Sequence, residues 1–416
     1  MYQSPRGTFD IYNEEYNLRK TIINTLFSIT EKYGFNNIET PIFEDVSLFV
    51  RTVGETSDIV NKEIYEFSDK KGRSLALRPE LTAPIMRSYI QNKMYAQNPI
   101  KKFAYYGPAF RYERPQAGRF RQFYQFGIES FGIKNPVYDA QIIAMAKEIL
   151  DFLNINNYKI FINTIGSQED RKKYNEALKT YFHQYQDDLC SDCLKRLSKN
   201  PLRILDCKHD NQKEFFKQIP KLENYLSQNS KKYFDDIKKA LNDLEINYEV
   251  DENLVRGLDY YNDIVFEIKM NTNNAKDTVI GGGRYDYLAS TLEGPFVESI
   301  GFAIGVERLI DLFKQENEIS INDYKLKYDI FLGAINDEDI LKINKLLISL
   351  RNLGFICETN YEKQSYKSCL KQSLKNEAIF LITIKEEKFI LKNLIEKTEK
   401  ELTDMEIIDY FKEMHE

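Results

Sequence analysis

The sequence is poor in the residues on which several common kinds of site depend. It holds three histidines, so a histidine base or a histidine-rich metal site has few candidates. Its five cysteines, an odd number in a chain of 416 residues, do not form a disulfide framework. No run approaches the ~18 apolar residues that a membrane helix needs. Arginine, glutamate and tyrosine are therefore the side chains expected to carry the chemistry.

Length and charge narrow the class of protein further. A mass of 49.1 kDa is too large for one small core, so two or three domains are expected. The N-terminal sequence MYQSPRGTF has neither an apolar signal core nor an Arg/Ser-rich presequence, which favours a cytoplasmic location. The net charge of −6 gives no support to nucleic-acid binding, so such a partner would need local basic patches.

Residues 1–325 carry the signals of an α+β domain with a mixed, mainly antiparallel sheet. Apolar residues recur at helical spacing over residues 18–33 and predict a helix. Residues 38–43 form a short apolar segment that predicts a strand interrupted by Pro41, and a proline places such a strand at an edge or an interface. Residues 103–131 show strand, turn-rich loop and strand, which predicts an antiparallel hairpin.

Two other segments have a different composition. Residues from about 170 to 248 are rich in lysine and asparagine, and their pattern predicts a helical insertion. In residues 326–416 strands and helices alternate, which predicts a separate α/β domain with a mainly parallel sheet. Its expected strands are residues 328–332, 355–357 and 379–384, and its expected helices are residues 340–353 and 367–374.

The second strand of the hairpin has an unusual polar face. Side chains alternate along a strand, so Gln125, Gly127 and Glu129 share one side. A glycine between two polar residues would let a small polar ligand lie against the strand. A face turned to solvent is an equally good interpretation from the pattern alone.

The loop within the hairpin is a local basic patch in an acidic protein. Residues 110–121 contain four arginines and one glutamate. Arginines suit bidentate contacts to phosphate oxygens, whereas the alternative is a solvated surface loop. The adjoining polar strand face favours phosphate binding.

Three further segments bring polar residues to the ends of predicted elements. Glu80 and Thr82 lie at a strand-to-helix transition, where Thr82 would cap the helix and Glu80 would accept from an ammonium group, with capping alone as the alternative. The glycine-rich turn at residues 279–286 lacks both the G-x-G-x-x-G and the P-loop patterns, so its glycines would allow close approach of a ligand to the backbone. Arg308 falls in the first turn of a helix, against the helix dipole, which suggests a compensating anion.

The cysteines of the insertion are candidate metal ligands. Cys190 and Cys193 have C-x-x-C spacing, but Cys207 and His209 are too close in sequence for a usual zinc knuckle. The pattern favours reduced thiols, with structural zinc as the second interpretation, so no metal site is predicted.

Together the motifs resemble the histidyl-tRNA synthetases of bacterial type, a family of class II aminoacyl-tRNA synthetases. The resemblance covers nearly the whole chain. It is carried by RGLDYY at residues 256–261, GGGRYD at 281–286, Pro41, FRYER at 110–114, GVERL at 305–309 and NPLRILDC at 200–207. It implies a class II catalytic domain over residues 1–325 and an anticodon-binding domain over residues 326–416.

The resemblance also implies an activity and a set of site residues. The chain would activate L-histidine with ATP, in the presence of Mg²⁺, to histidyl-adenylate and pyrophosphate, and then transfer histidine to the 3′ end of its tRNA as a homodimer without a membrane partner. The implied roles are catalysis for Arg256 and Arg111, histidine binding for Glu80, Thr82, Gln125, Glu129, Tyr260 and Tyr261, and ATP binding for Arg111, Arg119, Arg121, Arg308, Gly281 and Gly283.

These roles make chemical sense. Charge accumulates on phosphate oxygens during adenylate formation, and fixed arginines stabilise it without proton transfer. A carboxylate and a phenol at opposite ring nitrogens, here Glu129 and Tyr261, would reject isosteres that cannot hydrogen-bond at both ends.

Three alternatives stay open. The regulatory subunit of ATP phosphoribosyltransferase resembles the same catalytic core, but it usually lacks the α/β tail. A different class II synthetase is disfavoured by the RGLDYY motif, and a non-catalytic nucleic-acid scaffold by the acidic net charge.

Overall fold

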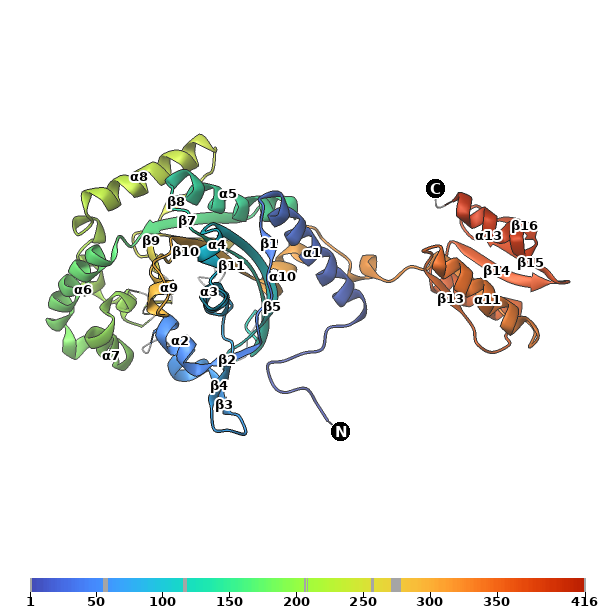
Figure 1. Cartoon of the computed structure of the whole chain (residues 1–416), viewed down its shortest axis with the longest axis horizontal. Coiled ribbons are helices and arrows are strands. Elements are labelled where there is room, and N and C mark those ends of the chain that lie inside the picture. The colour runs from blue at the N-terminus through green and yellow to red at the C-terminus, as the bar shows by residue number, and fades with distance from the viewer. Residues whose placement is uncertain are drawn as a thin grey trace. The chain divides into compact units, whose positions relative to one another are not determined.

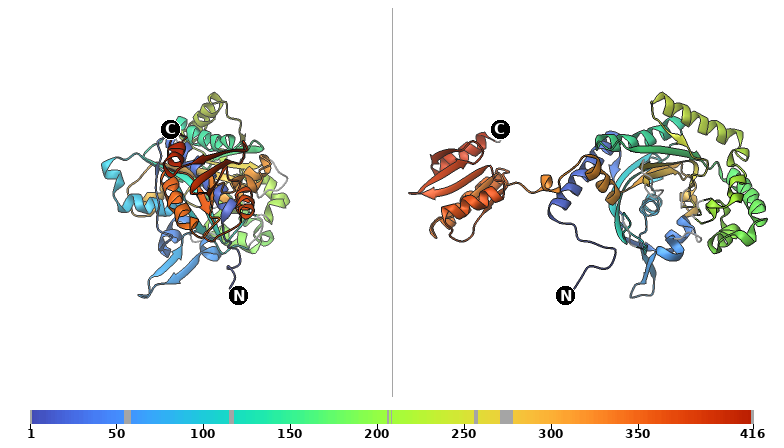
Figure 2. Two further views of the ribbon diagram at one scale, coloured as in Figure 1. Left: turned by 90° about the vertical axis from the view of Figure 1, so that its right-hand side faces the viewer. Right: turned by 180° about the vertical axis from the view of Figure 1, so that it is seen from behind.

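The computed structural model describes residues 2–54, 59–114, 118–205, 207, 209–255, 258–270 and 278–414. The chain divides into two compact units, Met1–Ser320 and Ile321–Glu416 (Figures 1 and 2). The division lies five residues before the boundary expected at residue 325. No helix of the described residues is long and apolar enough to cross a membrane.

The first unit is built on an eight-stranded sheet with the order β1-β5-β6-β11-β10-β9-β7-β8. Its strands are β1 (Asn36–Asn37), β5 (Lys101–Phe110), β6 (Gln122–Phe131), β7 (Tyr158–Thr164), β8 (Glu249–Val250), β9 (Asn262–Met270), β10 (Thr278–Arg284) and β11 (Ser299–Gly305). The pairs β1–β5 and β7–β8 are parallel, and the other neighbours are antiparallel. The predicted mixed, mainly antiparallel sheet and its β5–β6 hairpin are confirmed.

Helices cover both faces of this sheet. On one face lie α1 (Asn13–Lys32), α5 (Pro136–Phe152) and α10 (Val306–Glu316), and the ring of Phe27 in α1 meets Phe126 of β6 at 5.1 Å. On the other face the sheet curves around α3 (Thr82–Gln91), as Figure 1 shows. The short helices α2 (Val46–Val53), α4 (Met94–Gln97) and α9 (Leu288–Thr291) contact α3. The alternation predicted for β6 therefore turns its apolar side chains toward α1 and its polar ones toward α3.

A small antiparallel sheet, with the order β2-β4-β3, precedes α3. It consists of β2 (Phe43–Asp45), β3 (Tyr65–Ser68) and β4 (Ser74–Leu77), and the π-helical segment η1 (Ile59–Glu63) precedes β3. The prediction of one strand over residues 38–43 is wrong, because β1 ends at Asn37 and β2 begins at Phe43. Pro41 lies between them, where its missing N–H breaks no ladder.

The insertion is helical, as predicted. It contains α6 (Gln168–His183), α7 (Ser191–Lys199) and α8 (Gln228–Asp243), the last of which packs along α5. Short 3₁₀ turns link them: η2 (Gln186–Asp188), η3 (Pro201–Ile204), η4 (Asp210–Gln212), η5 (Glu214–Gln218) and η6 (Leu222–Asn224). A separate apolar core around Leu178, Phe182 and Leu197 holds this part together.

The second unit is an α/β module with the sheet order β13-β12-β14-β15-β16. Its elements are η7 (Ile321–Tyr324), β12 (Ile330–Gly333), α11 (Asp339–Asn352), β13 (Cys357–Thr359), α12 (Tyr366–Lys375), β14 (Phe380–Lys385), β15 (Lys388–Asn393), β16 (Thr398–Leu402) and α13 (Asp404–Glu413). Strand β12 is parallel to β13 and β14, but β14, β15 and β16 are antiparallel. The expected mainly parallel sheet is thus only half parallel. Glu386 and Glu387 make the β14–β15 turn with φ of 47° and 65°, a conformation that asparagine or glycine would normally signal.

Candidate active site

Two adjoining cavities lie where β6, β10 and β11 face the start of α3. The smaller has a volume of about 60 Å³ and the larger about 270 Å³. Both are lined by Arg111, Gln125, Gly281 and Ala303, so a ligand in one would reach the other. This junction is the natural place for two substrates to meet.

The smaller cavity gathers every residue that the sequence suggested for histidine contacts. Its lining includes Glu80, Thr82, Gln125, Glu129, Tyr260 and Tyr261. They come from the start of α3, from β6 and from the segment before β9, which are far apart in the sequence. The structure brings the six together, while their individual roles stay predictions.

Glu129 is the most completely enclosed acid of the smaller cavity, with 1% of its surface exposed. Its Oε1 accepts hydrogen bonds from the Thr82 hydroxyl at 2.7 Å and from the Tyr105 hydroxyl at 3.2 Å. Its Oε2 accepts from the Tyr285 hydroxyl. Burial raises the pKa of Glu129 to about 8, although these donors oppose the shift. The carboxyl group is thus fixed in one orientation before any ligand enters.

Glu80 lies two residues before α3 and caps the start of the helix with its side chain, although Thr82 was the expected cap. The Glu80 carboxylate accepts the backbone N–H of Thr82 at 2.7 Å and that of Ala83 at 2.9 Å. The Thr82 hydroxyl is instead bound to Glu129. Burial raises the pKa of Glu80, and the helix N–H groups counter that shift. Glu80 therefore combines a capping role with a place in the cavity wall.

Gln125 supplies the clearest sign that the site is incomplete without a ligand. Its side-chain Oε1 is buried and has no hydrogen-bond partner among the described residues. A buried acceptor without a donor costs about 1–3 kcal/mol. Because Gln125 lines both cavities, a polar substrate at their junction would satisfy it.

Gly127 was expected to let a ligand lie against β6, but in the structure it makes room for a neighbouring side chain. A Cβ atom at this position would lie 2.4 Å from the Tyr105 hydroxyl and 2.5 Å from the carbonyl oxygen of Phe302. The glycine therefore makes room for Tyr105, which in turn donates to Glu129. The polar face of β6 does line the cavities, but through Gln125 and Glu129.

The segment that carries Tyr260 and Tyr261 is anchored by the insertion. The carboxylate of Asp259 accepts from Asn200 Nδ2 at 2.7 Å and from Arg203 Nε at 2.8 Å. Asn200 directly follows α7, and Arg203 lies in η3. Sequence reasoning assigned no role to them, because nothing in a linear pattern shows that they meet Asp259.

A second anchor comes from α6. Arg171 Nη1 donates to the backbone oxygen of Tyr261 at 2.6 Å and to that of Asp259 at 3.1 Å. These bonds fix the backbone at the two tyrosines. Arg256, the candidate catalytic arginine just before this segment, lies outside the described residues.

Arginines dominate the larger cavity. Arg111 donates from Nε to the carbonyl oxygen of Pro79 at 2.9 Å, and its guanidinium lies 5.2 Å from the ring centre of Phe123. Arg119 also lines this cavity and forms a 2.8 Å ion pair with Glu113. The Pro79 carbonyl and the Phe123 ring thus hold the planar guanidinium of Arg111 in place at the junction of the cavities.

Arg308 and Arg121 have different outcomes. Arg308 lies in the first turn of α10, as expected, and lines the larger cavity, with Nη1 donating to Thr278 O at 2.7 Å, while its contact with ATP stays a prediction. Arg121 is not among the residues that line either cavity. Its guanidinium stacks 3.9 Å from the ring centre of Tyr112, so the predicted ATP contact is without structural support.

The two glycines that were expected to bind ATP, Gly281 and Gly283, differ in their position relative to the cavities. Gly281 lines both cavities. Gly283 lines neither. A Cβ there would meet the carbonyl oxygen of Ile264 at 2.5 Å and the ring of Tyr261 at 3.1 Å. Gly283 is required for close packing of β10 against β9, and its predicted contact with ATP is not supported.

Several residues of the site were missed by sequence reasoning. Tyr105 and Tyr285 hold Glu129, and Glu307 lines the larger cavity while its carboxylate binds Arg19 at 3.0 Å and the Tyr124 N–H at 3.0 Å. The alternation of β5 could have pointed to Tyr105, which pairs directly with Gly127. The other contacts cross between distant segments.

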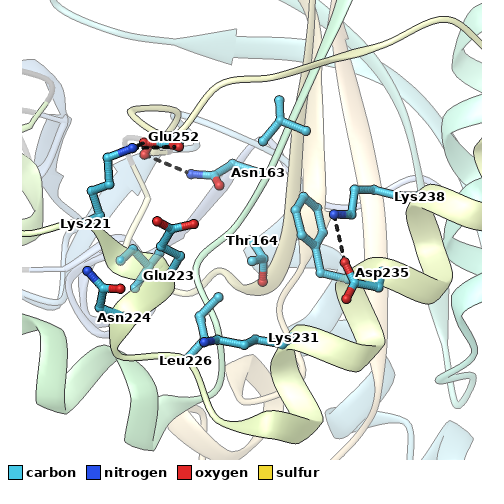
Figure 3. Close-up of a pocket in the computed structure, with 13 residues that line it drawn as sticks. Asn163, Thr164, Lys221, Glu223, Asn224, Leu226, Lys231, Asp235, Lys238 and Glu252 are labelled. Atoms are coloured by element: carbon cyan, nitrogen blue, oxygen red, sulfur yellow. Dashed lines mark hydrogen bonds and ion pairs between the residues drawn. The ribbon is translucent and has the colours of Figure 1, made fainter.

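A cavity of about 320 Å³ lies elsewhere, between β7, η6 and α8 (Figure 3). Its charged residues largely pair with one another: Lys221 lies 3.0 Å from Glu252, and Lys238 lies 2.8 Å from Asp235. These groups are exposed or half-buried and already paired, so this cavity offers no counterpart to the enclosed acids of the site.

Comparison with known proteins decides which family has this site. The family model for histidyl-tRNA synthetase matches residues 7–309. The chain belongs to the histidyl-tRNA synthetase family. Histidine–tRNA ligases of Halothermothrix orenii and Bacillus subtilis are 43% and 44% identical over 383 and 392 residues, which cover 92% and 93% of this chain and 91% of each relative. The apo crystal structure of Staphylococcus aureus histidyl-tRNA synthetase matches with a TM-score of 0.83 at 36% identity, over 99% of this chain and 100% of that chain.

Membership of the histidyl-tRNA synthetase family confirms the interpretation of the motifs. The chain is a histidine–tRNA ligase with the class II fold, and ATP binding and a part in protein synthesis follow from the family. The regulatory-subunit and scaffold alternatives lose their support.

Proposed function

We propose that this histidine–tRNA ligase holds L-histidine in the smaller cavity and ATP in the larger one. The observation that carries the proposal is the shared wall, in which Arg111 and Gln125 belong to both cavities. The carboxylate of histidine and the α-phosphate of ATP would meet there, beside an oriented guanidinium.

Recognition of histidine is assigned to the buried polar groups of the smaller cavity. Glu129 reads one ring nitrogen and Tyr261 the other, with Tyr260 completing the wall. Glu80, the Thr82 hydroxyl and Gln125 bind the α-ammonium group. The fixed orientation of Glu129 supports this role, since a carboxylate locked by its neighbours discriminates against ligands that cannot complete its hydrogen bonds.

Activation follows from the shared position of Arg111. An oxygen of the histidine carboxylate attacks the α-phosphorus, and the bond from that phosphorus to the oxygen bridging toward the β-phosphorus breaks. Histidyl-adenylate and pyrophosphate are the products. Arg111, with Arg256 as the second arginine by resemblance, stabilises the negative charge that builds up on the phosphate oxygens.

The rest of ATP is assigned to the larger cavity. Arg308 and Arg119 bind phosphate oxygens, and Gly281 lets the nucleotide approach β10. Mg²⁺ belongs to the proposal because ATP carries it. Glu113 and Glu307 line the cavity with the oxygen ligands that Mg²⁺ prefers. Glu307 is bound to Arg19 and to the Tyr124 N–H. Glu113 is paired with Arg119, which this proposal assigns to phosphate oxygens, so Glu113 is the candidate ligand once Arg119 exchanges that pair for the phosphate.

Transfer requires the tRNA acceptor end at the adenylate and a second contact elsewhere on the tRNA. The second unit, Ile321–Glu416, is proposed as the anticodon-binding domain. Cytoplasmic location is part of the same proposal, because the enzyme supplies the ribosome.

A homodimer is proposed through the region around Pro41. Three apolar side chains of this region are exposed: Ile42, which precedes β2, by 44%, Phe43 of β2 by 53% and Phe67 of β3 by 41%. The rings of Phe43 and Phe67 lie 6.3 Å apart and form one apolar patch. A partner covering this patch would remove it from water. Sedimentation of wild type and of Phe43→Ser/Phe67→Ser tests this proposal, and a wild-type monomer at micromolar concentration contradicts it.

Histidine-dependent exchange of pyrophosphate into ATP tests the site assignment. Wild type should exchange with histidine and Mg²⁺ present, and Arg111→Ala should lose exchange while still binding histidine. Arg121→Ala is the matched control, because Arg121 comes from the same loop but lines neither cavity. Equal loss in both variants would refute the special position of Arg111.

A further inference from the structure

Three cysteines and one aspartate of the insertion converge on a single point. The sulfur atoms of Cys190, Cys193 and Cys207 and a carboxylate oxygen of Asp210 all lie within 4.8 Å of one another. Cys193, Cys207 and Asp210 are buried, and Cys190 is partly exposed. We propose that these four side chains bind one zinc ion that holds the insertion together.

The spacing of the sulfur atoms fits a tetrahedral ion. Zinc–sulfur bonds of about 2.3 Å in tetrahedral geometry place neighbouring sulfurs roughly 3.8 Å apart. The Sγ atoms of Cys190 and Cys207 are 3.8 Å apart. A disulfide requires about 2.05 Å, and all five cysteines are free. Sulfur and carboxylate oxygen are both ordinary zinc ligands.

The local fold explains why the sequence pattern was misleading. Cys190 immediately precedes α7, Cys193 lies in its first turn, and Cys207 follows η3. His209, the nearest histidine to these cysteines in the sequence, is exposed, whereas the next residue, Asp210, is fully buried and faces the sulfurs. The motif is therefore two pairs with the same spacing, Cys190-x-x-Cys193 and Cys207-x-x-Asp210.

Backbone and side-chain contacts around the four ligands suit a metal site. The Cys190 N–H donates to Asp210 Oδ2 at 2.9 Å, and the Asp210 N–H donates to the Cys207 sulfur at 3.4 Å. Lys213 Nζ lies 2.8 Å from Asp210 Oδ1. Three thiolates and a carboxylate around Zn²⁺ leave negative charge, which these donors and the lysine offset. Contacts of this kind orient ligands and tune metal affinity.

The competing interpretation is that the cysteines simply fill the small apolar core of the insertion. Cys193 and Cys207 do pack there with Leu197 and Ile204. That interpretation accounts for the pairing of Asp210 with Lys213 and with the Cys190 N–H, but it does not explain why three sulfur atoms converge on the same buried carboxylate. As a zinc ligand the same carboxylate is neutralised where it lies.

The site has a structural consequence for the active site. The chain between Cys193 and Cys207 contains Asn200 and Arg203, which hold Asp259 beside the histidine-pocket tyrosines. A metal that ties both ends of this stretch fixes the two donors. None of the four ligand side chains lines either cavity of the active site, so the role of the ion is to position the loop rather than to take part in catalysis.

Metal analysis of the full-length chain, purified without a histidine tag from zinc-supplemented cells, tests the proposal. One zinc per chain is expected. Cys190→Ser/Cys207→Ser should contain none, and the matched control Cys357→Ser/Cys369→Ser, which changes the two buried cysteines of the second unit, should keep one. Lys213→Ala should weaken zinc binding roughly tenfold.

A measurement on wild type alone covers the case in which the double variant does not fold. Cobalt(II) added to zinc-free protein should give the visible bands of a tetrahedral ion and a thiolate-to-cobalt charge-transfer band. Absence of both bands, absence of zinc in wild type, or equal zinc in the two double variants would each overturn the proposal. Five free thiols in zinc-free wild type would then identify the apolar-core arrangement, and fewer would identify a disulfide.

Discussion

The two cavities of the active site are organised in different ways. In the smaller one, buried side chains bind one another: Thr82, Tyr105 and Tyr285 all donate to Glu129. In the larger one, arginines are oriented by backbone carbonyls, as Arg111 is by Pro79 and Arg308 by Thr278. The side chains of the smaller cavity form a closed hydrogen-bond network with fixed geometry. In the larger cavity, backbone carbonyl groups hold the arginines that supply its positive charge.

The difference matches what each half has to do. Discrimination among amino acids needs polar groups that stay unsatisfied unless the correct ligand enters, and a rigid network supplies them. Stabilising a phosphoryl transition state needs positive charge directed at developing negative charge. Variants in the larger cavity should therefore slow the reaction, and variants in the smaller one should weaken binding of histidine.

The largest effect is expected from Arg111→Ala. Loss of a fixed donor to the transition state should lower kcat for pyrophosphate exchange about 10²- to 10³-fold, with little change in KM for histidine. Arg111→Lys should rescue only part of this loss, because an ammonium cannot make the bidentate contact. A rise in KM for histidine with unchanged kcat would show that Arg111 belongs to the recognition network instead.

In the smaller cavity, Glu129→Gln is expected to have a smaller effect than Arg111→Ala has in the larger one. Replacing the carboxylate with an amide removes a charged hydrogen bond to the imidazole, so KM for histidine should rise roughly 10- to 100-fold. KM for ATP should stay the same. Tyr285→Phe, which removes one donor to Glu129, should have the same kind of effect at reduced size. Steady-state exchange kinetics with each substrate varied in turn would measure both, and equal effects on the two KM values would contradict the division.

The features that could be predicted from the sequence are those that depend on neighbouring residues. The β5–β6 hairpin, the helical insertion and the placement of Gln125 and Glu129 on one face follow from local periodicity, which is a property of neighbouring residues. Placing Arg111 and Arg308 in one site required the family resemblance, because their separation in sequence carries no spacing rule.

The contacts that escaped prediction join distant segments. Asn200 and Arg203 bind Asp259, and no pattern within either stretch indicates the other. Gly283 and Gly127 were expected to face ligands, but close packing against Tyr261 and Tyr105 requires them. A glycine in a strand shows that something approaches closely, and only the three-dimensional structure shows what approaches.

The anchor of the tyrosine segment should have a moderate effect. Asp259→Asn removes the ion pair with Arg203 but keeps an acceptor for Asn200. Loss of one such interaction is worth about 0.5–1.5 kcal/mol, so kcat/KM for histidine should fall roughly 3- to 10-fold. A double-mutant cycle with Arg203→Met separates the pair from other effects. Additive losses would show that Asp259 and Arg203 act independently, against the anchoring role.

The smallest expected effect is a pH dependence that belongs to the smaller cavity. Burial raises the pKa of Glu129 from 4.5 to about 8, so between these values the folded protein keeps a proton that the unfolded chain releases. Stability therefore falls as the pH rises from about 4.5 through about 8, and Glu129→Gln should remove this part of the slope. The neighbouring Glu80, Tyr105 and Tyr285 stay in place in that variant.

Thermal midpoints of wild type and Glu129→Gln, measured from pH 5 to pH 9, test this slope. The two curves should separate progressively toward pH 8 and run parallel above it, because the wild-type carboxyl group is then ionised in both the folded and the unfolded state. Saturating histidine should reduce the difference, since an imidazole N–H donor favours the carboxylate in the folded state. Curves that stay parallel throughout would mean that Glu129 is already ionised in the free enzyme. The smaller cavity would then present an ionised carboxylate to histidine before binding. The two cavities would differ only in how their charged side chains are held in place.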